Sequence, residues 1–434
     1  MLRFLLPLGL AVFYFSPSSA QTVDVGAVSV VKGEADQPPY ITQPTVALTL
    51  EMALKQAFEA NPALLAAAHE SAAERATITQ AQLFPNPHIS TQIEDTRRAT
   101  RVTTLQLNQL IELGGKRDAR VEAAERGGDV ALATLAAKRA DVRAEVELAF
   151  VDLLTAQQRL QLAEHSMALA GRVTVAAARR VMAGKVSPVE ESKARVAEAE
   201  VRLLLLQARS DLTMARQRLA ATWGDAGALF ESVVGDLSLL PALPSLTALT
   251  RALVNSPVML RERSALGRRQ ALLEVERRRR IPDVTVSLGV KRAEELARDQ
   301  AVLGLSIPIP LFDRNQGNVL ETLRRTDKAR DELVATELHL TVALAQAHAG
   351  LSVARQTVDA LRSEILPGAH TAYDVVTRGF ELGKFNFLEV LDAQRTLIQA
   401  ELQHLRALSD AHRAAVEIER LLGGLPAVSS LANR

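Results

Sequence analysis

The chain has 434 residues, of which 51 are Lys or Arg and 50 are Asp or Glu, and 48% are hydrophobic. This balance is typical of an ordered protein, and a formal net charge of +1 gives no reason to expect nucleic acid as a partner. The chain contains no cysteine, which excludes disulfides, thiolate metal sites and a lipidated cysteine.

Residues 1–20 have the pattern of a secretory signal peptide. Arg3 precedes a short apolar segment, 4–15, and small residues follow at 18–20. A membrane anchor is the alternative, but this segment is too short to cross about 30 Å of hydrocarbon. Beyond it, no apolar run is long enough for a helical span. Residues 21–48 are mixed in composition and are expected to form an extended arm.

The remaining sequence is a tandem duplication, because similar motifs recur in the same order. The spacing grows from 195 residues, between Asn61-Pro62 and Ser256-Pro257, to 199 residues, between Gly184-Lys185 and Gly383-Lys384. The predicted organisation is therefore a first repeat at 49–224, a Gly- and Pro-containing linker at 225–245, a second repeat at 246–424 and a tail at 425–434.

Each repeat is predicted to contain the same series of elements. A helix (near 49–83 and 246–280) is followed by two strands with alternating polarity (88–94 and 101–113; 284–291 and 302–311). Long helices follow at 114–182 and at 317–366, where Pro367 interrupts a run that continues to about 381. A Gly-Lys turn and a helix of about 35 residues complete each repeat.

Heptad spacing in the last helices predicts coiled-coil packing. Val189, Val196 and Leu203 recur every seven residues, as do Leu391, Ile398 and Leu405. Four strands per chain are too few for an ordinary soluble sheet, although the edge of one would also alternate. A polar face and an apolar face instead suit a transmembrane barrel to which several chains contribute strands.

Several motifs carry a family resemblance over nearly the whole chain. They are FPNP at 84–87, IELGGKRDAR at 111–120, IPIPLFDRNQG at 307–317 and GKFNFLEVLDAQR at 383–395. With the duplicated unit, they resemble the TolC-like outer-membrane efflux proteins, and especially the branch for cobalt–zinc–cadmium resistance.

The resemblance implies a mainly α fold with a small β part. Three chains would each give four strands to one twelve-stranded outer-membrane β-barrel in contact with lipid. Their long helices would continue it as a coiled-coil α-helical barrel through the periplasm. It also implies two protein partners, a periplasmic adaptor (membrane fusion) protein and an inner-membrane pump of the resistance–nodulation–division (RND) class. No cofactor, enzymatic activity or nucleic-acid partner is implied.

The resemblance also assigns residues to a periplasmic gate. Glu389 and Asp392 would line the entrance, where symmetry would repeat them as carboxylate rings. Phe380 and Phe385 stand where the family has a bracing tyrosine and an arginine, so the closed state must be held differently. A solvated helix face is the alternative for the acidic pair.

The Gly-Lys turns are expected to cap the helices that precede them. Gly184 and Gly383 would take a positive φ, while Lys185 and Lys384 would complement the negative helix ends. Their position also suggests tips where the adaptor docks. The eight histidines include no pair at the i,i+3 or i,i+4 spacing of a metal site, so no high-affinity site is expected.

The leading hypothesis is the exit duct of a tripartite efflux system for divalent heavy-metal cations. A duct for organic compounds or for type I protein secretion is the alternative within the same class. A periplasmic coiled-coil adaptor or scaffold is the alternative from another class.

Overall fold

The computed structural model describes residues 47–227 and 230–424. These residues belong to one compact unit. The predicted signal peptide, the arm up to residue 46 and the C-terminal tail lie outside the described residues. Along the chain, the helices and strands are α1 (Leu50–Ala60), α2 (Pro62–Ala81), β1 (His88–Glu94), β2 (Val102–Ile111), α3 (Lys116–Met182), α4 (Pro188–Ala221), α5 (Leu246–Leu253), α6 (Pro257–Arg278), β3 (Val284–Ala293), β4 (Arg298–Ser306), α7 (Gln316–Ala360), a π-helix η1 (Leu361–Ile365), α8 (Leu366–Glu381) and α9 (Phe387–Leu422).

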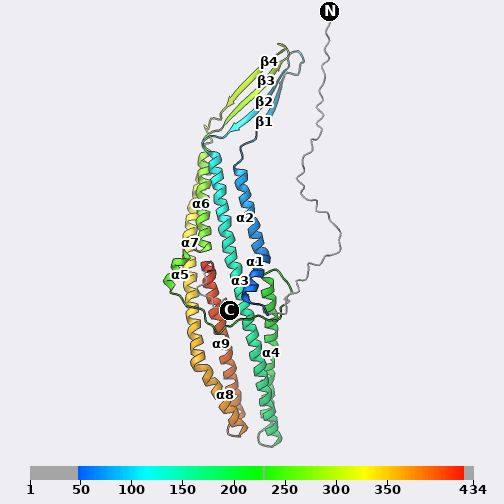
Figure 1. Ribbon diagram of the computed structural model, residues 1–434, viewed down its shortest axis with the longest axis vertical. Helices are drawn as coiled ribbons and strands as arrows, with labels where there is room; N and C mark the ends of the chain where they lie inside the picture. The colour runs from blue at the N-terminus through cyan, green and yellow to red at the C-terminus, as the bar shows by residue number, and fades with distance from the viewer. Residues whose placement is uncertain (1–46, 228–229, 425–434) are drawn as a thin grey trace, which may run out of the picture. The chain divides into compact units, whose positions relative to one another are not determined.

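The strands and the helix turns lie at opposite ends of this unit. Figure 1 shows the four-stranded sheet beyond the ends of α2, α3 and α6, and the α3–α4 and α8–α9 turns at the other end. The order of elements is the same in both repeats, which confirms the internal duplication and the mainly α fold. Among the described residues, no helix combines the length and the apolar character needed to cross a membrane.

The first helix of each repeat is broken where the sequence predicted one continuous helix. Asn61 ends α1, and its side-chain oxygen then accepts a hydrogen bond from the Leu64 amide to start α2. Ser256 starts α6 in the same way by accepting from Met259. A proline follows each cap at the first helical position, where a missing amide hydrogen costs nothing.

The fourth strand is also displaced from its predicted range of 302–311. It begins earlier, at Arg298, because residues 298–301 pair with β3 across a tight turn. It ends at Ser306, since Pro308 and Pro310 have no amide hydrogen to donate to a ladder. The Leu311 amide instead donates to the Ile309 carbonyl in a local turn.

Helix α8 follows α7 through η1 and contains Pro367, which the sequence identified as an interruption. Proline cannot donate an amide hydrogen to the helical ladder. The chain adapts through η1, in which the Leu366 amide donates to the Leu361 carbonyl. Such a π-turn adds a residue to the helix locally and is often found near functional positions.

The linker packs against the core between the two repeats. Leu48 pairs with Val233, the rings of Trp223 and Phe230 lie 6.0 Å apart, and Leu237 is fully buried. Side chains from α7 and α9 hold the linker backbone, with His348 and His412 bonded to its carbonyls at 3.0 Å. The linker therefore joins the repeats into one body.

The predicted coiled-coil seam of α4 faces outward. Val189, Val196 and Leu203 are 58%, 61% and 66% exposed. The side that packs on α3 is offset from them and carries mostly small residues, Ala194, Val201, Ala208 and Ala215. The exposed heptad stripe is thus left without a partner among the described residues.

Candidate functional site

The sheet has one apolar and one polar face. Antiparallel register places Ile89, Leu107, Leu288 and Leu303 in a single row across β1, β2, β3 and β4. The apolar side chains on this face are between 38% and 79% exposed, namely Ile89, Ile93, Leu105, Leu107, Val286, Leu288, Val290, Leu303 and Leu305. A continuous exposed apolar face of this kind marks a surface that is covered by lipid or by protein.

The opposite face of the sheet is polar and internally hydrogen-bonded. Asn108 lies at its centre and is buried. Its amide nitrogen donates to Ser90 Oγ at 2.9 Å, and its carbonyl oxygen accepts from Ser287 Oγ at 2.6 Å. The two faces together match the alternation of transmembrane strands that have lipid on one side and water on the other.

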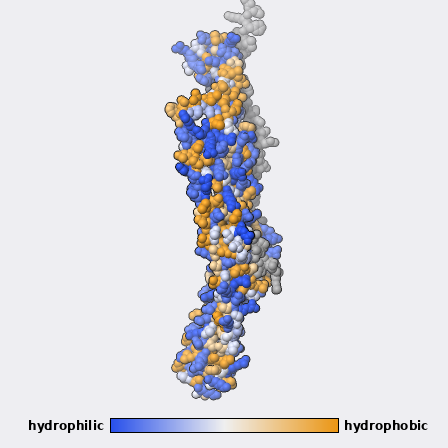
Figure 2. Space-filling view, turned by 90° about the vertical axis from the view of Figure 1, so that its left-hand side faces the viewer, coloured by the Kyte–Doolittle hydropathy of each residue, from blue (hydrophilic) through white to orange (hydrophobic). Residues whose placement is uncertain are grey.

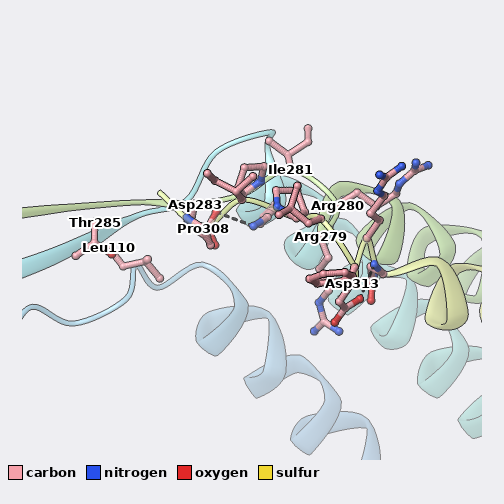
Figure 3. Close-up of a pocket in the computed structure, with 16 residues that line it drawn as sticks. Leu110, Arg279, Arg280, Ile281, Asp283, Thr285, Pro308 and Asp313 are labelled. Carbon is pink, nitrogen blue, oxygen red and sulfur yellow. Dashed lines mark hydrogen bonds and ion pairs between the residues drawn. The ribbon is translucent and has the colours of Figure 1, made fainter. Parts of the chain in front are cut away.

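A charged joint connects the sheet to the helices and encloses a cavity of about 610 Å³. Figure 3 shows Asp283, which lies just before β3. Its carboxylate forms an ion pair with Lys116, at the start of α3, at 2.7 Å. Asp283 also accepts a hydrogen bond from the Leu113 amide at 3.1 Å. Arg278, at the end of α6, donates to the Gly114 carbonyl at 3.0 Å. The joint thus ties the first repeat to the second.

The family-like motifs build the turns at this joint. Gly115 and Asn315, which precede α3 and α7, both adopt the left-handed conformation, with φ of 67° and 59°. Arg120 forms two hydrogen bonds with Glu112, at 2.6 and 3.1 Å.

Figure 2 shows hydrophobic side chains gathered next to the sheet on the face that it displays, with hydrophilic ones further along the helices.

The two Gly-Lys turns form exposed tips at the other end. Gly184 and Gly383 have φ of 67° and 80°, as the capping hypothesis requires. The amides of Lys185 and Lys384 donate to carbonyls near the ends of α3 and α8. Both lysine side chains are exposed.

The predicted gate residues have different environments. Phe380 is 2% exposed, in a cluster with Val173, Ala177 and Ala194 of the first repeat. Phe385 is 37% exposed and covers Gly379, where an added Cβ would overlap its ring. Neither phenylalanine lies near the sheet.

The acidic pair also divides into two roles. Glu389 Oε2 accepts from the Asn386 amide, and Asn386 Oδ1 accepts from the Glu389 amide, both at 3.0 Å. This capping box starts α9 and orients the carboxylate of Glu389. Asp392 lies on the next turn with an exposed side chain. In the first repeat, Glu190 occupies the place of Glu389.

Arg180 of α3 connects the hairpin of α3 and α4 to the hairpin of α8 and α9. The sequence analysis missed this residue. Its guanidinium donates to the Phe380 carbonyl at 2.9 Å and lies 4.4 Å above the Phe380 ring. Phe380 packs in turn on Phe387, with ring centroids 6.0 Å apart. The only sequence signal was an Arg pair at a helix end, which is also typical of ordinary dipole compensation.

Ion pairs between α3 and α9 also link the two repeats. Arg420 contacts Asp141 at 3.2 Å, and Arg413 contacts Asp152. Glu147 is 2% exposed and pairs with Arg143 at 2.8 Å, and burial raises the pKa of Glu147. Within residues 47–227 and 230–424, no group of three or more His, Asp or Glu could hold a metal ion.

Known proteins place this arrangement in a family. The cobalt-zinc-cadmium resistance protein CzcC of Cupriavidus metallidurans is 47% identical over 98% of this chain and 100% of its own length. The nickel and cobalt resistance protein CnrC of the same organism is 31% identical over 67% of this chain and 70% of its own.

Solved structures show the same fold. The CusC channel superposes with a TM-score of 0.76 over 88% of this chain and 93% of its own, at 18% identity. The outer membrane protein VceC of Vibrio cholerae gives 0.74 over 86% and 96%, also at 18% identity. The outer membrane efflux protein family matches both repeats, over residues 53–225 and 248–424. This chain therefore belongs to the outer membrane efflux protein family, whose members are outer-membrane channels that extend into the periplasm and are not enzymes.

Proposed function

We propose that this chain is the exit duct of a tripartite efflux system that exports divalent heavy-metal cations such as cobalt, zinc and cadmium. The observation that supports these cations as the cargo is the 47% identity to a cobalt-zinc-cadmium resistance protein over 98% of this chain and 100% of that protein. A duct performs no chemistry on its cargo. In this proposal an inner-membrane RND pump supplies the energy, and a periplasmic adaptor joins pump to duct.

We further propose a trimer, which the open sheet supports. Within the described residues, β1 and β4 are each paired along one edge only. An exposed edge is a template for another strand, and closure into a barrel removes it. Three copies would supply twelve strands, with the row of Ile89, Leu107, Leu288 and Leu303 facing lipid.

The exposed apolar stripe of α4 supports contacts with neighbouring chains. Val189, Val196 and Leu203 form a heptad seam that no described helix covers. In the proposed assembly, this stripe packs on helices of the next protomer or of the adaptor. The tips at Gly184, Lys185, Gly383 and Lys384 would then meet the adaptor, which is a proposal that their exposure and position support.

The gate proposal assigns different tasks to the residues at the periplasmic end. Glu389 and Asp392 would give the entrance its negative charge, repeated by symmetry. Arg180 would hold the α8–α9 hairpin against the α3–α4 hairpin in the closed state, through Phe380. Phe385 would support the turn by packing on Gly379.

The experiment is a deletion of the gene, followed by growth on graded concentrations of cobalt, zinc and cadmium salts. We expect lower tolerance to at least one metal, with recovery when the wild-type gene is returned. Unchanged metal tolerance with higher sensitivity to drugs would favour the organic-compound duct. Unchanged tolerance to both, with loss of a secreted protein, would favour type I secretion.

A further inference from the structure

Three helices from both repeats meet in a small apolar cluster below η1. Ala369 and Tyr373 of α8 pack there against Leu397 and Ala400 of α9, and Leu169 of α3 packs against them. Each helix also carries a titratable side chain at the border of this cluster. His370 follows Ala369, Glu401 follows Ala400, and His165 lies one helical turn before Leu169. Packing therefore brings the side chains of His370 and Glu401, which lie on different helices, next to one another.

The two closest groups have the spacing of metal ligands. His370 Nε2 and Glu401 Oε1 are 3.5 Å apart. Zinc binds imidazole nitrogen and carboxylate oxygen at about 2.0–2.2 Å, and tetrahedral geometry then places two ligand atoms about 3.4 Å apart. A divalent cation could therefore sit between these atoms with little movement of either helix.

The carboxylate of Glu401 is the anionic ligand of this pair. Partial burial raises the pKa of Glu401, whereas the charges of His370 and His165 act in the opposite direction. A carboxylate that has lost part of its hydration gains more from a nearby cation than an exposed one does. The side chain of His370 is 55% exposed and that of Glu401 is 22% exposed, so an ion and its waters can reach them.

We propose that His370 and Glu401 form a weak two-ligand site for a divalent cation, with water completing the coordination. The site lacks the three ligands of a storage or structural centre, which suits a duct because cargo must leave again. His370 would bind the ion through the lone pair of its imidazole nitrogen, and Glu401 through a carboxylate oxygen. The interpretation of this ion as cargo rests on the proposed function, whereas the site itself does not.

The position of the site gives it a mechanical consequence. The π-turn η1 ends at Ile365, just before the first turns of α8, where His370 lies. An ion bound to both ligands would tie α8 to α9 immediately below this turn. The ion would therefore restrain the helix next to the π-turn, where the regular α-helical hydrogen-bond pattern is interrupted.

The test is calorimetric titration of the purified full-length protein with Co²⁺ at pH 7.5. We expect His370→Ala and Glu401→Gln each to weaken binding at least tenfold, and His165→Ala to leave it unchanged, because His165 is not a ligand. The double variant should bind at least as weakly as either single variant, because it removes both protein ligands of the same ion. His339→Ala, which changes an exposed histidine on α7, is the matched control and should bind as the wild type does.

A second measurement separates this proposal from general metal adsorption. Co²⁺ should slow amide hydrogen exchange in residues 361–370 of the wild type and not in His370→Ala. Equal binding by the wild type, His370→Ala and Glu401→Gln would overturn the site, as would no binding by the wild type. Either result would leave the growth phenotype of the deletion strain unaffected, so failure of the site and failure of the proposed function are distinguishable.

Discussion

Replacing Arg180 with alanine should loosen the contact between the two hairpins. The substitution removes the 2.9 Å hydrogen bond to the Phe380 carbonyl and the stacking at 4.4 Å over the Phe380 ring. A hydrogen bond from a charged donor contributes about 1.5–3 kcal/mol when buried, and a cation–π contact at an exposed site about 0.5–1 kcal/mol. Because Arg180 is only half-buried, we take about 2 kcal/mol for the pair. This free energy corresponds to a shift of roughly 30-fold per protomer in the equilibrium toward the state in which the two hairpins are apart.

The assay is single-channel recording of the purified protein in planar bilayers. We expect Arg180→Ala to raise the open probability strongly. Arg180→Lys should have an intermediate effect, because lysine keeps the charge but loses the planar stacking surface. Arg179→Ala is the matched control, since Arg179 is the exposed neighbour on the same helix. An equal open probability for Arg180→Ala and Arg179→Ala would refute the proposal that Arg180 holds the two hairpins together in the closed state.

Three further predictions concern the same end of the molecule and the linker. Gly379→Ala should lower the melting temperature, because its Cβ would overlap the Phe385 ring, and adding Phe385→Ala to the same chain should restore the melting temperature. The control is Gly171→Ala, which has open space around it and should be neutral or stabilising by up to about 1 kcal/mol. Asp392→Asn should reduce cation selectivity, measured as the reversal potential in a salt gradient. Glu389→Ala, which removes the acceptor for the Asn386 amide, should mainly destabilise the start of α9, by about 1 kcal/mol; a larger selectivity change from Glu389→Ala would reverse these roles. Burial lowers the pKa of His412, so the unfolded chain takes up a proton first as the pH falls below about 6.5, and stability should decrease from there down to the folded-state pKa. His412→Gln, whose amide can still donate to the Leu237 carbonyl, should show a smaller decrease in melting temperature between pH 7 and pH 5, and an equal decrease would exclude His412 as the cause.

Local chemistry determined the elements that were predicted correctly. The first strand was predicted at 88–94 and lies at His88–Glu94, because alternation and flanking prolines both act over a few residues. The break at Asn61-Pro62 was visible in the sequence but was read only as a repeat marker, although Asn followed by Pro is a strong helix start. The shift of β4 came from pairing of residues 298–301 with β3, which no local pattern reveals.

Less of the candidate site than of the fold could be predicted from the sequence. The spacing of Asn386 and Glu389 was enough to predict the capping box. It was missed because both residues belong to the 383–395 motif, which was interpreted only through its family resemblance. Arg180 and Phe380 are about half the chain apart in sequence and meet only through packing of α3 on α8 and α9. The heptad spacing of α4 predicted a coiled-coil seam, but the stripe is exposed in the single chain, because spacing alone does not reveal whether another helix of the chain covers it.

The half-paired strands β1 and β4 have a genetic consequence. In the proposed trimer, each subunit must accept a strand on one side and offer one on the other, so a single defective copy leaves the ring unclosed. If intact subunits and subunits with a blocked strand edge are made in equal amounts and mix at random, only about one trimer in eight contains three intact copies. A mutant allele of this kind would therefore be dominant over the wild-type gene.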